Sequence, residues 1–89
     1  MDKKEARALL AAKLAEYRRL GYAALVDKIG DDECPEVTGP SGVAYQVEIQ
    51  FLWDDKPNGA VRVMGAIDDG GLRALMPLCD DFIIAPDGR

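Results

Sequence analysis

The sequence contains no histidine, and this absence removes the side chain that most often acts as a general base near neutral pH. The two cysteines, Cys34 and Cys79, are too few and too far apart for a structural zinc site. Because neither thiol has an imidazole to activate it, we interpret both as buried or incidental. We therefore expect no catalytic residue, no metal and no cofactor.

Long apolar runs are also missing. No segment approaches the ~20 consecutive apolar residues that span a bilayer. Residues 1–5 lack the apolar stretch of a secretory signal. The sequence therefore predicts a soluble protein without a membrane partner, located in the cytoplasm, where both thiols are reduced.

Basic residues are scarce outside the first third of the chain. Residues 1–28 contain seven Lys or Arg and four Asp or Glu, whereas residues 29–89 contain four and twelve, and the net charge is -5. An acidic body repels phosphates, and the basic residues lack interleaved aromatics, so no nucleic-acid partner is expected. The basic helix presents either a solvated face or a surface that docks on the acidic half of a second copy.

The chain has room for one domain, 1–89, with one hydrophobic core. Asp2 and Glu5 have the spacing of a capping box, so a helix is expected to begin near Lys3. Apolar residues then recur every three or four positions until Gly21, which can end a helix in the left-handed conformation. The same spacing predicts a shorter second helix over 22–29.

Apolar residues alternate with polar ones over 43–53, which indicates a half-buried strand. A similar alternation predicts strands over 61–67 and 72–78, and a short strand is expected over 34–38. Pro35 and Pro77 lack an N–H, so the first and fourth strands belong at the edges. The predicted fold class is α+β: the N-terminal helix and the short second helix pack on one face of a four-stranded antiparallel meander, order 1-2-3-4.

The register follows from the loops. Asp-Gly at 69–70 is the strongest short hairpin signal and favours a type I′ turn, which would pair Ile67 with Leu72 and Gly65 with Ala74. Small residues at this point leave room for the helix to approach the sheet. The loop between the strands over 43–53 and 61–67 keeps their apolar residues on the same face if Trp53 pairs with Val61. The apolar tail at 82–84 must then be buried elsewhere.

The opposite phase of the strands forms a candidate interaction surface with an apolar middle and a charged border. Its residues are Glu48, Gln50, Leu52, Arg62, Met64, Arg73 and Leu75. Either this surface binds a protein partner or a second copy, or residues 82–84 fold back over it. In a two-fold dimer, Glu48 of one copy would meet Arg62 or Arg73 of the other.

Asp-Asp pairs occur at 31–32, 54–55, 68–69 and 80–81. We interpret them as solvated turns, because their spacing does not match a calcium-binding loop. The sequence predicts a non-enzymatic protein-interaction module. The alternatives are a small carboxylate-based or metal-assisted hydrolytic enzyme, and an acidic inhibitor or immunity-type protein that covers a basic partner. A cleft with convergent carboxylates of raised pKa would favour the enzyme.

Overall fold

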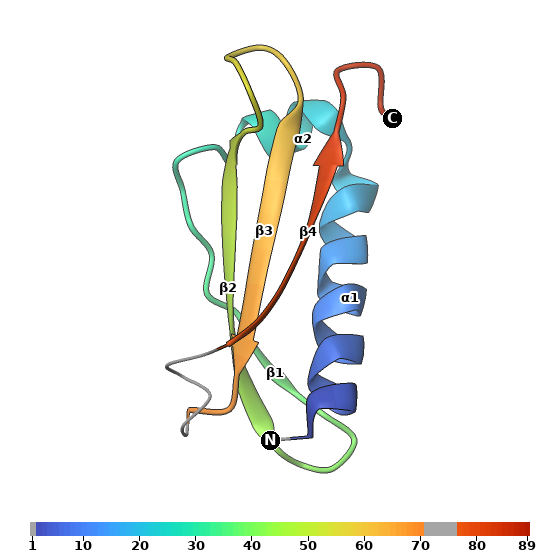
Figure 1. The fold of residues 1–89 in the computed structure, drawn as a ribbon, viewed down its shortest axis with the longest axis vertical. Helices are drawn as coiled ribbons and strands as arrows, with labels where there is room; N and C mark the ends of the chain where they lie inside the picture. Colours follow the sequence, from blue (N-terminus) through green and yellow to red (C-terminus); the bar gives the residue numbers. More distant parts are fainter. Residues whose placement is uncertain (1, 71–76) are drawn as a thin grey trace.

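The computed structural model describes residues 2–70 and 77–89. In chain order they form α1 (Lys3–Leu20), α2 (Tyr22–Val26), β1 (Glu36–Thr38), β2 (Ala44–Trp53), β3 (Val61–Asp68) and β4 (Leu78–Ile84). The strands make one antiparallel sheet in the order β1-β2-β3-β4. Figure 1 shows α1 running alongside this sheet, along the length of its strands. The predicted α+β fold class is confirmed.

The first helix begins and ends where the sequence indicates. The Asp2 carboxylate accepts the backbone N–H of Glu5 at 3.1 Å, and Gly21 adopts a φ of 87° at the other end. The Glu5 side chain does not complete the capping box. Its Oε1 instead accepts hydrogen bonds from the hydroxyls of Ser41, at 2.7 Å, and Tyr45, at 3.0 Å. Glu5 therefore ties the start of α1 to β2 and to the loop before it.

Two elements are shorter than predicted. The second helix ends at Val26 rather than at 29, because the following N–H groups bond to carbonyls three residues back in a series of turns. The first strand comprises Glu36–Thr38 rather than 34–38. Pro35 has no N–H to donate to the ladder, so regular pairing stops there, although its carbonyl still accepts the N–H of Val47 at 3.0 Å.

The predicted register of the two central strands is confirmed. Trp53 pairs with Val61, and the N–H of Asp54 donates to the carbonyl of Ala60 at 2.9 Å to close the loop. Asn58 in this loop has a φ of 67°, which asparagine tolerates better than most residues. The alternation of β2 and β3 consequently places their buried residues on the side of α1. The more polar and more exposed residues of both strands lie on the opposite side.

The predicted position of the fourth strand is wrong. β4 is Leu78–Ile84 rather than 72–78, so Ile67 pairs with Leu78, not with residue 72. The turn at 69–70 is not type I′, because among the described residues only Asn58 combines a side chain with positive φ. The strand begins an even number of residues later than predicted, so its even-numbered residues still face α1. It packs Phe82 against the core opposite Val63 and buries Ile84 opposite Val61, where residues 76 and 78 were expected.

The helix approaches the sheet at Gly65, as predicted. A Cβ on this residue would lie 2.8 Å from Leu10 Cδ1 and 3.2 Å from Leu14 Cδ2. The missing side chain therefore allows close contact between α1 and β3, while residue 74 lies outside the described part of the chain. The buried core around this contact consists of Ala6, Leu10, Leu14, Tyr17, Leu25, Tyr45, Val47, Ile49, Phe51, Val61, Val63, Ile67 and Ile84.

β4 forms one edge of the sheet, and its edge is protected. Pro77 directly precedes the strand, and the Asp80 carboxylate accepts the backbone N–H of Asp81 at 2.8 Å. That N–H is therefore satisfied within the strand. The adjacent carboxylates of Asp80 and Asp81 also repel the edge of another acidic chain, which disfavours pairing there. The Asp-Asp pair at 80–81 lies inside a strand, so its interpretation as a solvated turn is wrong.

Candidate functional site

The side of the sheet opposite α1 carries the candidate site, and we call it the outer face. Along β2 its residues are exposed and alternate with buried residues that face the helix. The pairing of β2, β3 and β4 arranges the centre of this face in three rows. They are Leu52 beside Arg62 and Ile83, Gln50 beside Met64 and Asp81, and Glu48 beside Ala66 and Cys79.

Exposed apolar side chains gather at one end of the outer face. Leu52 is 37% exposed, and Met64 and Ile83 are each 39% exposed. Met64 lies diagonally to both of the others, a separation that long side chains can bridge. The other large hydrophobic side chains that are exposed in the described residues, Leu20 and Val43, lie outside the strands. The grouping of three such residues is typical of a binding surface rather than of scattered exposure.

Arg62 stands in the middle of the apolar end, but its charge is already paired. Its guanidinium donates to Asp54 Oδ1 from Nε at 3.0 Å and from Nη2 at 2.8 Å. Its Nη1 donates to Asp81 Oδ2 at 2.5 Å. The ion pair expected between Glu48 of one copy and Arg62 of another would therefore have to displace bonds within the chain.

A shallow hollow of about 410 Å³ opens on the outer face. It lies across β2, β3 and β4, where the small side chain of Ala66 leaves space between longer neighbours. Glu48 borders it on the side of β2, and Asp81 borders it on the side of β4. Asp80 of β4 also lines the hollow, so its apolar floor lies between Glu48 on one side and Asp80 and Asp81 on the other.

The structure brings together five of the seven residues that the sequence analysis proposed. These are Glu48, Gln50, Leu52, Arg62 and Met64. Arg73 and Leu75 lie outside the described residues. The alternative that residues 82–84 cover the surface is wrong, because this segment is part of β4 itself.

Three residues of the outer face were missed: Cys79, Asp81 and Ile83. They belong to the strand that was predicted too early in the chain. The alternation of Leu78, Phe82 and Ile84 with these residues was a signal for their position, although Asp80 interrupts its apolar phase.

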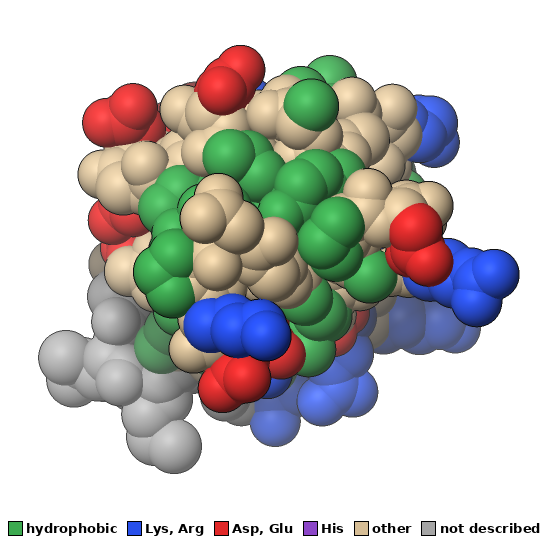
Figure 2. Space-filling view, turned by 90° about the horizontal axis from the view of Figure 1, so that it is seen from above, with side chains coloured by type: hydrophobic (Ala, Val, Ile, Leu, Met, Phe, Trp, Pro, Cys, Tyr) green, Lys and Arg blue, Asp and Glu red, His purple; other side chains and the backbone are tan. Residues whose placement is uncertain are grey.

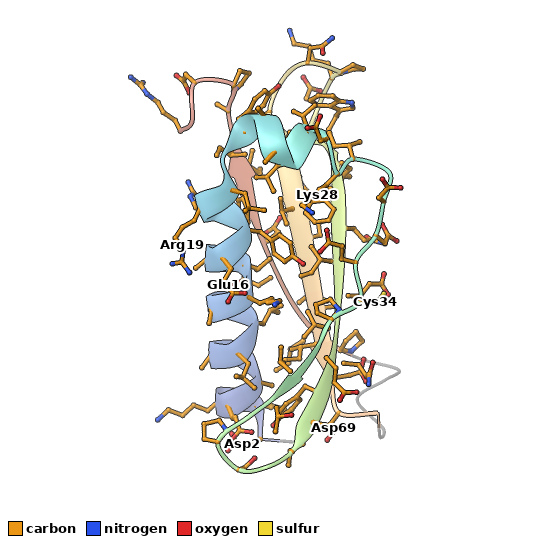
Figure 3. All side chains as sticks on the ribbon, turned by 180° about the vertical axis from the view of Figure 1, so that it is seen from behind. Asp2, Glu16, Arg19, Lys28, Cys34 and Asp69 are labelled. Atoms are coloured by element: carbon orange, nitrogen blue, oxygen red, sulfur yellow. The ribbon has the colours of Figure 1, made fainter. Side chains whose placement is uncertain are left out.

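Both thiols are exposed, so of the two predicted alternatives, buried or incidental, the structure excludes burial. Cys79 lies on the outer face, where its Sγ contacts the carbonyl oxygen of Pro77 at 3.7 Å. Cys34 lies in the segment that precedes β1, beside β2 (Figure 3).

A second polar cluster lies on the helix side of the sheet. The Tyr17 hydroxyl donates to Glu33 Oε1 at 2.7 Å, and Lys28 Nζ donates to Glu33 Oε2 at 2.6 Å. The hydrogen bond from Lys28, followed by that from Tyr17, lowers the pKa of Glu33. Burial and the bond to Glu33 raise the pKa of Tyr17, whose ring meets Phe51 edge to face at 5.4 Å. A carboxylate held ionised in this way anchors the segment before β1 to α1; it is not the raised-pKa carboxylate that would favour an enzyme.

Within residues 2–70 and 77–89, no group of three Cys, Asp or Glu side chains is arranged to hold a metal ion. Asp54 and Asp81, which belong to two of the Asp-Asp pairs, both form ion pairs with Arg62. The helices in the same ranges are too short or too polar to cross a membrane.

Comparisons of the chain with protein-family models, with curated proteins and with solved structures find no match. The functional argument therefore rests on the physical chemistry of the outer face.

Proposed function

We propose that the protein is a non-enzymatic interaction module that binds another protein, or a second copy of itself, through the outer face. The observation that supports this is the grouping of Leu52, Met64 and Ile83 on a sheet face that no helix of the described residues covers. A sheet face with no partner usually carries polar side chains, because exposed apolar groups add little to the stability of the fold.

The composition of the face agrees with a binding role. Its apolar end is bordered by Gln50, Glu48 and Asp81, the pattern of an apolar interface centre with a polar rim. The molecule measures 39 × 22 × 17 Å, so its broad side is on the order of the ~800 Å² that each partner contributes to a standard interface. A protein partner therefore fits both the chemistry and the size of this face.

The proposal includes a cytoplasmic location and no nucleic-acid partner. Both rest on composition: a net charge of -5 and two cysteines, both of them free thiols in the structure.

Site-specific photo-crosslinking tests the proposal. A benzophenone amino acid replaces Met64 on the outer face, and in a matched control it replaces Ala12, which is exposed on α1. Irradiation in a lysate of the native cell is expected to give a discrete protein adduct from position 64 and not from position 12. Equal adducts from both positions, or none from 64 and from a second outer-face position at Leu52, would refute the interaction surface.

A further inference from the structure

Negative charge dominates the outer face. Its described carboxylates are Glu36, Glu48, Asp68 and Asp81. Its described cation is Arg62, and this guanidinium is shared between Asp81 and Asp54. The face as a whole is therefore acidic around its apolar end.

Positive charge lies on the other side of the molecule. The exposed basic side chains of α1 are Lys3, Lys4, Arg7, Arg18 and Arg19. In the end view of Figure 2, Lys and Arg atoms lie mainly on the side that α1 occupies in Figure 1. Figure 3 shows Arg19 pointing away from the sheet. The two sides of the molecule consequently attract partners of opposite charge.

Glu48 is the carboxylate on the β2 side of the hollow, and no cation of the described residues pairs with it. Gln50 Nε2 donates to Glu48 Oε1 at 3.1 Å. This amide is neutral, so it orients the carboxylate but does not cancel its charge. Asp81, across the hollow, is instead bonded to Arg62. Asp80 also lines the hollow, but it pairs with Gly65 in the phase that faces α1, and its Oδ1 accepts the N–H of Asp81. A cation on the outer face therefore meets the unpaired charge of Glu48.

The floor of the hollow suits an aliphatic chain. Ala66 presents a methyl group between Glu48 and Cys79, and Met64 presents a thioether between Gln50 and Asp81. Lys and Arg side chains combine an apolar stem with a charged end, and they commonly lay the stem along apolar surface while the charge reaches a polar group. The hollow offers both parts of that arrangement.

A second copy fits the outer face less well. In a two-fold contact the same surface patch meets itself, so carboxylates of one copy would approach carboxylates of the other. Like charges across an interface are unfavourable, and Arg62 is already occupied by Asp54 and Asp81. The charge of this face is complementary to a basic partner.

We propose that the outer face binds a basic segment of a partner protein, with a Lys or Arg side chain lying over Ala66 and its charge at Glu48. This inference rests on the proposed function and specifies the chemistry of its partner. Leu52, Met64 and Ile83 then contact the apolar residues that flank the basic one.

An NMR titration tests the proposal with a defined probe, the peptide acetyl-(Lys-Leu-Ala)4-amide. The readout is the methyl resonance of Met64 in protein labelled at the methionine methyl groups. The variants are Glu48→Gln and, as a matched control, Glu16→Gln, which removes the same charge from the exposed side of α1. A second peptide with Gln in place of Lys controls for apolar binding alone.

The Lys peptide is expected to shift the Met64 resonance in a saturable way, and Glu48→Gln to weaken binding by about fivefold, the size of one exposed ion pair. Glu16→Gln is expected to change the affinity less than twofold. Equal weakening by both variants would mean diffuse attraction and would overturn the proposal. Equal binding of the Gln peptide would overturn it as well.

The two proposals fail in different ways. A crosslink from position 64, with no saturable binding of the Lys peptide, would leave the interaction surface in place and remove the basic partner. An adduct of twice 9.7 kDa would identify a second copy as the occupant and also overturn the basic partner. Absence of any outer-face crosslink would remove the interaction surface itself.

Discussion

The two faces of the sheet come from the same strands but differ in what holds their side chains. On the inner face, Leu10 of α1 is 2% exposed and packs toward β3, and Ile49 of β2 is fully buried. On the outer face, Leu52 and Met64 have more than a third of their surface exposed. Burial explains the inner set, because removing apolar surface from water stabilises the folded chain. It does not explain the outer set, which is why we propose that the outer face binds a partner.

The difference separates two kinds of substitution. A change on the inner face is expected to alter the free energy of unfolding, whereas a change on the outer face is expected to alter binding at nearly constant stability. Two leucines, Leu10 and Leu52, and two neighbours on β3, Gly65 and Ala66, provide matched pairs for this test.

The largest difference is expected between Leu10→Ala and Leu52→Ala. The first leaves a cavity beneath α1 and should lower the free energy of unfolding by about 2–5 kcal/mol. The second removes an exposed side chain and should change it by less than about 0.5 kcal/mol. Urea unfolding followed by circular dichroism measures both. Similar losses in the two variants would mean that the outer face is packed in solution.

A second pair compares adjacent residues of β3. Gly65→Val places methyl groups where Leu10 and Leu14 approach, and should cost about 1–3 kcal/mol. Ala66→Val points to the outer face and should stay within about 0.5 kcal/mol of the parent protein. If Gly65→Val leaves the urea midpoint unchanged, α1 does not dock over this glycine.

A smaller effect is expected from Glu33 on the inner side. Its pKa is lower in the folded chain than in the unfolded one, because Lys28 and Tyr17 donate hydrogen bonds to its ionised form. This stabilisation is present above the unfolded pKa and is lost as the pH falls through the folded pKa. Glu33→Gln should therefore cost on the order of 0.5–1 kcal/mol at pH 7, and less at pH 3. An equal cost at both pH values would contradict the assignment.

The smallest effect on stability is expected from Met64→Lys. The side chain is 39% exposed, so the new charge stays in water and unfolding should shift by less than about 0.5 kcal/mol. Light scattering at micromolar concentration should give the monomer mass of 9.7 kDa for the parent protein, because two acidic faces repel. A parent dimer that Met64→Lys dissociates would show that the outer face binds a second copy.

The elements with local signals were predictable from sequence. Asp2 and Gly21 carry the chemistry of a helix start and a helix end, and both bounds of α1 were found. The alternation of β2 and β3 is long and uninterrupted, so the pairing of Trp53 with Val61 followed from phase alone.

The fourth strand was not predictable in the same way. Residues 72–78 and 78–84 both carry an alternation of the same parity, and Asp80 weakens the second one. The choice between them depends on how much apolar surface each buries beside α1, and Phe82 and Ile84 decide it. This is a long-range packing energy, which no local pattern contains.

The same limit applies to the candidate site. The contributions of β2 and β3 to the outer face followed from their register. Ile83, Asp81 and the ion pairs of Arg62 depend on the true position of β4, and the hollow depends on how side chains of three strands fill space. These features require the folded arrangement.

The position of β4 also has a consequence for folding kinetics. α1 comes from the beginning of the chain, yet it packs against β3 and β4, which come from the end. Contacts between such distant segments close a long loop, so they form slowly and only after most of the chain has left the ribosome. Phe82 and Ile84 complete the core in the same step in which Asp81 and Ile83 complete the outer face. Until β4 has left the ribosome and docked, the chain therefore has neither a complete core nor a complete outer face.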